Sequence, residues 1–192
     1  GGEELHNNHH TYPTSAKLSV KPYEFDIGWL YIRVLSALGL AKVRKMPPLL
    51  HLGIVKPVAD SKTLEAIIAA RYELMARYAK ALRAACATEL ARAKAQGGAR
   101  VAEFKVARRW LHRDAEKIPG AVRPQVDAAV KDSPLLAKLV AMREELRQLW
   151  TRTNVSAEQL VADLQAWCRK AEASGIVALE DFSLKLRAAR TV

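Results

Sequence analysis

Apolar residues recur at helical spacing along most of the chain, and proline and glycine residues interrupt the pattern. Positions i, i+3, i+4 and i+7 share one face of an α-helix, so this repeat predicts helices that turn one face toward a core. The pattern predicts helices over residues 24–43, 62–95, 101–117, 125–132, 134–152, 157–173 and 176–190. A short helix over residues 3–12, stopped by Pro13, is expected before them.

The turn and capping residues predict how these helices connect. Gly97 and Gly98 separate the second and third long segments, so we expect an α-hairpin there. Asp60 or Ser61, Ser133 and Ser156 stand where helix N-caps are preferred. The segments within 134–190 are then expected to form a three-helix unit, with Trp150 and Trp167 in its core.

The amino-acid composition favours helix over sheet. Half of the 192 residues are apolar but only 6% are aromatic, and alanine is abundant. The predicted fold class is all-α: a short first helix, an amphipathic helix, a long α-hairpin and the three-helix unit. We expect three parts, residues 1–48, a linker at 49–60 and a helical C-terminal extension at 61–192.

The most apolar stretch, residues 27–41, is too short and too polar for a membrane span. It contains Arg33, and the chain has no run of about 18 uncharged apolar residues. We therefore expect a buried or interfacial helix. Its Trp29 and Tyr31 are expected in a core rather than at a membrane surface.

The net charge of +11 and the pI near 9.9 favour anionic partners. A phospholipid surface, acyl-CoA phosphates and nucleic acid all fit, as does simple solvation of exposed helices. The segment 101–117 has a pattern that a phosphate-backbone binder could use: Lys105, Arg108, Arg109 and Arg113 flank Trp110. Acidic residues interleave with it (Glu103, Asp114 and Glu116), and they favour an ordinary charged surface.

The remaining reactive side chains do not form a familiar catalytic pattern. Cys86 and Cys168 lie in separate helical segments without a C-x-x-C spacing, so we expect buried free thiols in a reducing compartment. His51 has no ligand-type residue at suitable spacing and is interpreted as structural. No nucleophile and base pair or glycine-rich phosphate loop occurs after residue 10.

Three of the five histidines fall within five residues near the start of the chain, in His6-Asn7-Asn8-His9-His10. On a helix, positions 6, 9 and 10 share one face, so all three imidazoles would leave it together. Neutral imidazole is a common ligand of iron, zinc, copper and nickel. The spacing predicts a metal site with His6, His9 and His10 as ligands, and Asn7 and Asn8 are candidates to orient them through hydrogen bonds.

This motif, with Thr11-Tyr12-Pro13 directly after it, resembles the third histidine box (HxxHH) of the membrane fatty-acyl desaturases. The stretch Tyr23 to Trp29, and then Ala37 to Ala41 before Lys42 and Arg44, resembles the sequence downstream of that box in the Δ9-type acyl-CoA and acyl-lipid desaturases. The resemblance covers residues 1–48. It identifies that part as the C-terminal end of a desaturase catalytic domain.

The resemblance implies a di-iron centre that uses O2 and electrons to place a cis double bond in a long-chain acyl group. The implied partners are an acyl-CoA or acyl-lipid substrate, a ferredoxin-like or cytochrome-like electron donor and the membrane, with this part on the cytoplasmic side. The family also has two upstream histidine boxes and transmembrane helices, which this sequence does not contain. We therefore expect a C-terminal fragment that is inactive alone, and no nucleic-acid partner is favoured.

An alternative from a different class is a basic helical interaction or nucleic-acid-binding module in which the histidine cluster is incidental. The net charge supports this alternative. The Ala- and Arg-rich tail also resembles the helical ends of some insertion-sequence transposases. Such helices resemble many proteins, so this resemblance receives little weight at the level of sequence.

Overall fold

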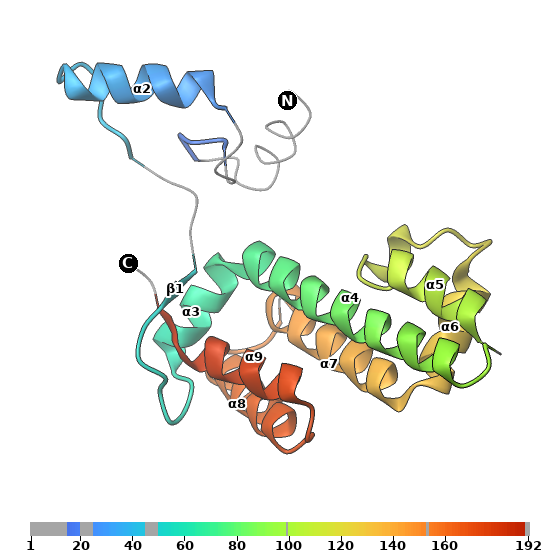
Figure 1. Ribbon diagram of the computed structural model, residues 1–192. Helices are drawn as coiled ribbons and strands as arrows, with labels where there is room; N and C mark the ends of the chain where they lie inside the picture. Colours follow the sequence, from blue (N-terminus) through green and yellow to red (C-terminus); the bar gives the residue numbers. More distant parts are fainter. Residues whose placement is uncertain (1–14, 20–24, 45–49, 99, 153, 191–192) are drawn as a thin grey trace. The chain divides into compact units, whose positions relative to one another are not determined.

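The structure, a computed structural model, describes residues 15–19, 25–44, 50–98, 100–152 and 154–190 (Figure 1). The chain divides into two compact units, Gly1–Leu49 and Leu50–Val192, and each is considered by itself. One helix lies in the described part of the first unit and helices dominate the described part of the second, so the predicted all-α fold class is confirmed.

The described part of the first unit centres on helix α2, Ile27–Ala37. Asp26 begins it: one carboxylate oxygen accepts a hydrogen bond from the Trp29 N–H at 2.8 Å. The other oxygen accepts from the N–H groups of Leu18 and Ser19, at 2.7 and 2.9 Å. Burial opposes ionisation of Asp26, but these three donors and Lys17 outweigh it and lower the pKa of Asp26.

Helix α2 is shorter than predicted, and it is not buried. None of its residues is buried, and the side chain of Tyr31 is 65% exposed. Trp29 and Tyr31 were both expected in a core. This prediction is wrong for Tyr31, whereas Trp29 is half-buried. None of the described helices is long and apolar enough to cross a bilayer.

The second unit contains seven α-helices and two very short strands among its described residues. The elements are β1 (His51–Leu52), α3 (Ser61–Ala69), α4 (Arg71–Ala95), α5 (Val101–Trp110), the 3-10 turn η1 (Ala115–Lys117), α6 (Arg123–Asp132), α7 (Pro134–Thr151), α8 (Ala157–Glu172), α9 (Val177–Arg187) and β2 (Ala189–Arg190). The predicted three-helix unit is confirmed as α7, α8 and α9, and the hairpin as α4 and α5 (Figure 1).

The segment 62–95, predicted as one helix, is two helices that meet at Ala70. Ala70 has a non-helical ψ of 17°, and the Arg71 guanidinium donates a hydrogen bond to the Ile68 carbonyl at 3.1 Å. That bond satisfies a carbonyl at the end of α3. The two helices pack on different partners, α3 on α8 and β2, and α4 on α5 and α7. Apolar spacing alone does not reveal such a break.

Two other predicted helices are shorter than expected. The helix beginning at Val101 ends at Trp110 rather than Lys117, and a 3-10 turn comes after it. The last helix ends at Arg187, because residues 189 and 190 pair antiparallel with β1 in the register Leu52 to Ala189. Two-residue strands are too short to produce an alternating pattern, so the sequence did not predict them.

The predicted N-caps of the second unit are confirmed at Asp60, Ser133 and Ser156. Each side-chain oxygen accepts a hydrogen bond from the N–H three residues later, at 2.8, 3.2 and 3.2 Å respectively. At the other end of α4, Gly97 and Gly98 adopt positive φ values of 97° and 83°. Glycine adopts this conformation at low cost, which permits the tight reversal into α5.

The core of the second unit is joined by three aromatic residues from three helices. Tyr78 of α4 and Phe182 of α9 meet edge to face with ring centroids 5.0 Å apart, and Phe182 meets Trp167 of α8 at 6.0 Å. The Tyr78 hydroxyl donates to the Leu139 carbonyl and the Trp167 indole N–H donates to the Met142 carbonyl, at 2.7 and 2.8 Å. Both acceptors belong to α7, so four helices converge here. The predicted core position of Trp167 is confirmed.

Both cysteines are buried and free, as predicted. Burial raises the pKa of the Cys86 thiol to about 11, with a further contribution from Glu89. Burial likewise raises the pKa of Cys168. Both thiols are therefore protonated and unreactive at neutral pH, and they act as small apolar core residues.

The Tyr78 hydroxyl provides a test of this core. Replacing Tyr78 with Phe leaves the ring packing in place but removes the donor to Leu139, so we expect a loss of about 1 kcal/mol in the free energy of unfolding. Urea denaturation followed by circular dichroism measures it. Tyr72→Phe, at a 45% exposed side chain, is the matched control and should change stability by less. Equal losses in the two variants would contradict the core assignment.

Asp60 makes the stability of the second unit depend on pH. The Lys56 ammonium donates to both carboxylate oxygens at 2.8 Å, and the Thr63 hydroxyl and N–H also donate, so the pKa of Asp60 lies well below its ordinary 3.8. Because this pKa is lowered in the folded protein, ionised Asp60 stabilises the fold. Its contribution to the free energy of unfolding is complete above pH 3.8 and is lost as the pH falls below that value.

Asp60→Asn keeps a capping oxygen but removes the charge that Lys56 binds. We expect urea denaturation to give the unmodified chain a higher free energy of unfolding than the variant, by a constant amount between about pH 5 and 7. This difference should disappear in more acidic solution. Asp127→Asn is the control at an exposed acid with no ion pair among the described residues. The same pH dependence in that variant would count against the role of Asp60.

Candidate nucleic-acid interface

The residues predicted to bind iron lie outside the described part of the chain. These residues are His6, His9 and His10, with Asn7 and Asn8 between them. Within the ranges that the structure describes, no three His, Cys, Asp or Glu side chains are placed to hold a metal ion. His51, interpreted as structural, lies half-buried in β1. The geometry of a site can therefore be built only from the other candidate, the basic segment at α5.

Helix α5 places its basic residues on the face opposite the core. Phe104, Ala107 and Leu111 point inward and are buried. Residues 105, 108, 109 and 112 share the outer face by helical spacing, and Lys105, Arg108 and Arg109 are exposed. Arg113 is exposed just beyond the helix. The α5 basic face is defined here as five exposed cations: Arg83 of α4, and Lys105, Arg108, Arg109 and Arg113.

Trp110 lies half-buried beside two of these cations. The Arg113 guanidinium carbon is 4.5 Å from the indole centroid and that of Arg109 is 5.7 Å away. Cations over an indole ring are attracted by its π electrons. The ring therefore holds both guanidinium groups near the surface without neutralising them, which leaves their charge available for an anion.

A buried arginine fixes the end of α5 against α7. Arg143 is 7% exposed, and its guanidinium donates a hydrogen bond to the Leu111 carbonyl at 2.9 Å. Burial lowers the pKa of Arg143, and the nearby carboxylate of Asp114 opposes that shift. The bond satisfies a carbonyl that the helix end would otherwise leave unpaired. The position of the α5 basic face thus depends on a contact 32 residues away in sequence.

The acidic residues after α5 are engaged by other cations. Asp114 lies 3.2 Å from the Lys117 ammonium and 3.9 Å from Arg147, while Glu116 lies 3.2 Å from Arg147. By contrast, no member of the α5 basic face forms an ion pair with any residue that the structure describes. Two of the three interleaved acids are therefore engaged by other cations, and the third, Glu103, forms no ion pair with this face among the described residues.

His112 continues the α5 basic face, and its environment is cationic. Burial lowers the pKa of His112, as do the charges of Arg83, Arg113 and Arg143, while the Arg108 carbonyl works in the opposite direction. The Nδ1 atom is enclosed and has no hydrogen-bond partner among the described residues. The ring is therefore mainly neutral at pH 7 in the free protein.

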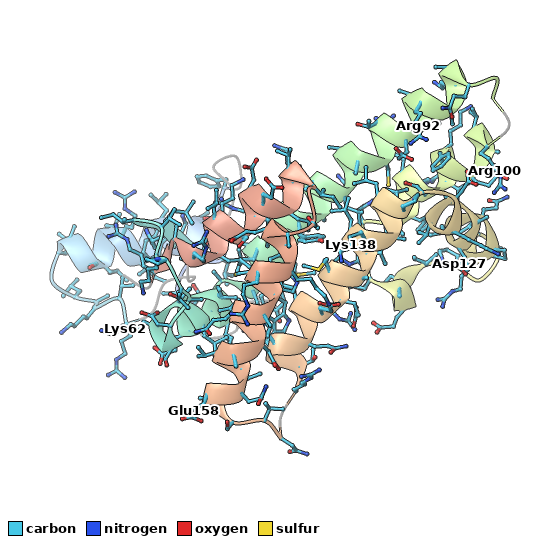
Figure 2. All side chains as sticks on the ribbon, turned by 90° about the horizontal axis from the view of Figure 1, so that it is seen from below. Lys62, Arg92, Arg100, Asp127, Lys138 and Glu158 are labelled. Atoms are coloured by element: carbon cyan, nitrogen blue, oxygen red, sulfur yellow. The ribbon has the colours of Figure 1, made fainter. Side chains whose placement is uncertain are left out.

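Two basic residues near the α4–α5 turn are matched by acids. Arg92 lies 3.7 Å from Glu89, and Arg100 lies 3.7 Å from Asp132. Figure 2 shows Arg92 and Arg100 at the α4–α5 turn, with Lys62 at the opposite end of this unit. These two cations of the turn are paired with acids, whereas the members of the α5 basic face, like Lys62, Lys94 and Lys185, form no ion pair among the described residues.

The sequence had singled out Lys105, Arg108, Arg109 and Arg113 around Trp110, but it did not include Arg83 or His112. Arg83 lies 22 residues before Lys105, and only the hairpin brings it to the same face. His112 could have been found from its spacing of four residues from Arg108. Its burial and its cationic neighbours could not.

A short segment of the chain is similar to fatty-acyl desaturases. It is 51% identical over 47 residues to the sn-1 stearoyl-lipid 9-desaturase of Synechocystis sp., which covers 24% of this chain and 15% of that protein. It is 52% identical over 48 residues to the sn-2 palmitoyl-lipid 9-desaturase of Nostoc sp., and 48% identical over 46 residues to the Delta-9 desaturase-like 2 protein of Arabidopsis thaliana.

These matches show a desaturase-like segment and nothing about the rest of the chain. The chain spans only 15–17% of the length of these three relatives. No solved structure matches the chain.

The helical second unit matches a different family. The model of the transposase family DDE_Tnp_ISL3 matches residues 56–191, from the segment before α3 to the end of β2. This range contains all the helices described in the second unit, and it includes the α5 basic face. Because the match extends over well more than half of the sequence, the chain belongs to this transposase family.

Proposed function

We propose that the second unit is a DNA-binding part of a transposase, and that the α5 basic face holds the phosphate backbone. The observation that carries the proposal is a group of exposed cations, Arg83, Lys105, Arg108, Arg109 and Arg113, that form no ion pairs with described residues. The family match adds a class of enzyme that acts on DNA. Sequence reasoning had favoured no nucleic acid, and these two observations together reverse that preference.

The chemistry of the face suits a sequence-independent contact. Arginine presents a planar fork of donors that matches phosphate oxygens, and binding releases the counterions condensed on the DNA. Two guanidinium groups already contact the Trp110 ring, so the arrangement favours backbone contacts over base stacking. We infer a positioning role on the duplex, with reading of the sequence left to other parts of the transposase.

Salt dependence tests this proposal directly. We expect the full chain to bind a fluorescent 20-base-pair duplex in an anisotropy titration, with log K falling as log salt rises. The double variant Arg108→Gln/Arg109→Gln should lower that slope by about 2, because each lost phosphate contact removes about one unit.

The matched control removes two exposed lysines from helices outside the α5 face, Lys62→Gln and Lys185→Gln. This control should retain the slope of the unmodified chain. Equal slopes in the two double variants would show that the α5 basic face is not the contact. No binding at about 20 mM salt would refute DNA binding as the function.

As a second candidate function, we propose that the desaturase-like segment is part of the catalytic domain of a fatty-acyl desaturase within a longer polypeptide. The identity of about one half to 9-desaturases over 46–48 residues favours it. In this proposal His6, His9 and His10 are iron ligands, and Asn7 and Asn8 orient the imidazoles. Three imidazoles are suitable donors for iron.

A bound di-iron centre would supply O2 activation for introducing a double bond into a long acyl chain carried by a lipid or CoA. The electrons would come from a donor protein, and the site would lie at the cytoplasmic side of a membrane. In this proposal the three histidines are only part of the ligand set, so this chain is expected to be inactive alone.

Metal titration tests this second candidate. We expect the full chain to bind Co²⁺, a spectroscopic substitute for ferrous iron, weakly and with at most one ion at the histidine motif. His9→Ala should weaken the binding seen by visible absorbance, whereas His51→Ala should leave it unchanged. Two tightly held ions would contradict an incomplete ligand set, and loss of binding in His51→Ala would contradict its structural role.

A further inference from the structure

The outer face of helix α2, in the first unit, is apolar and open to solvent. Six large apolar side chains follow the helical spacing i, i+3, i+4, i+7, i+8 and i+11, so they form one stripe along the helix. Their exposed fractions lie between 41% and 66%. The residues of this α2 stripe are Ile27, Leu30, Tyr31, Val34, Leu35 and Leu38. A contiguous apolar surface of this kind marks an interaction site, whereas single exposed apolar residues need no explanation.

The opposite face of α2 is the covered one. Trp29 and Ile32 lie on it, and both are half-buried. Asp26 fixes the start of the helix, because its carboxylate accepts hydrogen bonds from the N–H groups of Leu18 and Ser19 at 2.7 and 2.9 Å. The helix is therefore held against its own unit in one orientation, and the α2 stripe is the side that this orientation leaves free.

The exposed charges around the α2 stripe are all positive. Arg33 lies on the helix, and Lys42 and Arg44 come directly after it; all three are exposed and form no ion pair with a described residue. Asp26 is the one acid among the described residues of this unit, and it is 8% exposed and accepts three backbone hydrogen bonds. An apolar surface with an excess of cations complements a partner that is both apolar and anionic.

We propose that α2 binds along the surface of an anionic phospholipid bilayer. In this arrangement the α2 stripe enters the boundary between headgroups and acyl chains, and Arg33, Lys42 and Arg44 lie at the phosphates. The second candidate function attributes membrane attachment to the transmembrane helices of the desaturase family. This inference instead assigns a lipid contact to α2 itself, and it depends on neither proposed function.

The dimensions of α2 favour a bilayer over a second copy of the chain. The helix has 11 residues, or about 16 Å, whereas a stable helix pair repeats its apolar seam over about three heptads or more. Pairing two α2 stripes would also bring the cations of both copies together. A bilayer surface needs no matching side chains, and it accommodates an amphipathic ring such as that of Tyr31 at the level of the headgroups.

The experiment measures co-sedimentation of the full chain with large vesicles of phosphatidylcholine that contain about 30% phosphatidylglycerol, and with pure phosphatidylcholine. We expect binding to the anionic vesicles. The double variant Leu30→Gln/Val34→Gln should lower the partition coefficient by about tenfold or more, because two buried apolar side chains are lost. Ile54→Gln/Val177→Gln is the matched control at apolar residues that are 93% and 69% exposed in the second unit, and it should bind as the unmodified chain does.

A pair of charge variants separates α2 from the α5 basic face. Lys42→Gln/Arg44→Gln should weaken binding to the anionic vesicles by about tenfold and leave the remaining binding to pure phosphatidylcholine unchanged. Arg108→Gln/Arg109→Gln should retain vesicle binding. Loss of vesicle binding in the second variant alone would assign the lipid contact to the α5 basic face and overturn this inference.

A fluorescent label reports which face of α2 enters the bilayer. Val34→Cys places a thiol in the α2 stripe, and Ser36→Cys places one on the other side of the helix; the two native cysteines are buried. We expect the emission of an NBD label to shift to the blue on addition of anionic vesicles at position 34 and to change little at position 36.

Equal responses at the two positions, or vesicle binding by Leu30→Gln/Val34→Gln that matches that of the unmodified chain, would overturn the inference. A dimer in analytical ultracentrifugation that this double variant converts to a monomer, with no binding to vesicles, would also overturn it and assign the α2 stripe to a second copy of the chain. DNA binding by the second unit stands or falls independently of these results.

Discussion

The second unit depends on the buried aromatic contact between Tyr78 and Phe182, extended by Trp167. Edge-to-face packing joins α4, α9 and α8, and the two hydrogen-bond donors of this cluster end on carbonyls of α7. Aromatic rings bury a large apolar area, and their polar atoms need partners once water is excluded. Four helices are therefore fixed by one group of mutually dependent contacts, and the long helix α4 keeps its direction because of it.

The direction of α4 determines where the basic residues of α5 lie in the second unit. Helix α4 extends beyond the aromatic cluster to the Gly97–Gly98 reversal, and α5 returns along it with its cations outward. Arg143 of α7 holds the end of α5 in place through the Leu111 carbonyl. Acids near this region are paired with Arg147 and Lys117, so the cations of the α5 basic face remain without an ion pair among the described residues.

The chain combines two segments with different relatives. A segment of fewer than fifty residues is similar to desaturases, while residues 56–191 belong to a transposase family. The compact units divide at residue 49, close to the start of the transposase match. The part assigned from the sequence as an extension of a desaturase is thus the part with the family membership. The resemblance to desaturases could be identified from the sequence because a histidine box is a dense local motif. The transposase family could not, because amphipathic Ala- and Arg-rich helices look alike in many proteins.

Local chemistry explains why much of the fold could be predicted from the sequence. The caps at Asp60, Ser133 and Ser156, the glycine reversal and the burial of Cys86 depend on residue types and their spacing within a few turns of helix. The break at Ala70 and the pairing of β1 with β2 could not be predicted, because both depend on which distant element each segment packs against.

For the candidate site, the sequence determined which cations lie on the outer face of α5, since helical periodicity alone places Lys105, Arg108 and Arg109 together. Only the tertiary structure decided that these charges remain unneutralised and that Arg83 and His112 join them. Ion pairing and burial depend on distances between elements such as α4, α5 and α7, and those distances are set by core packing rather than by neighbours in the chain.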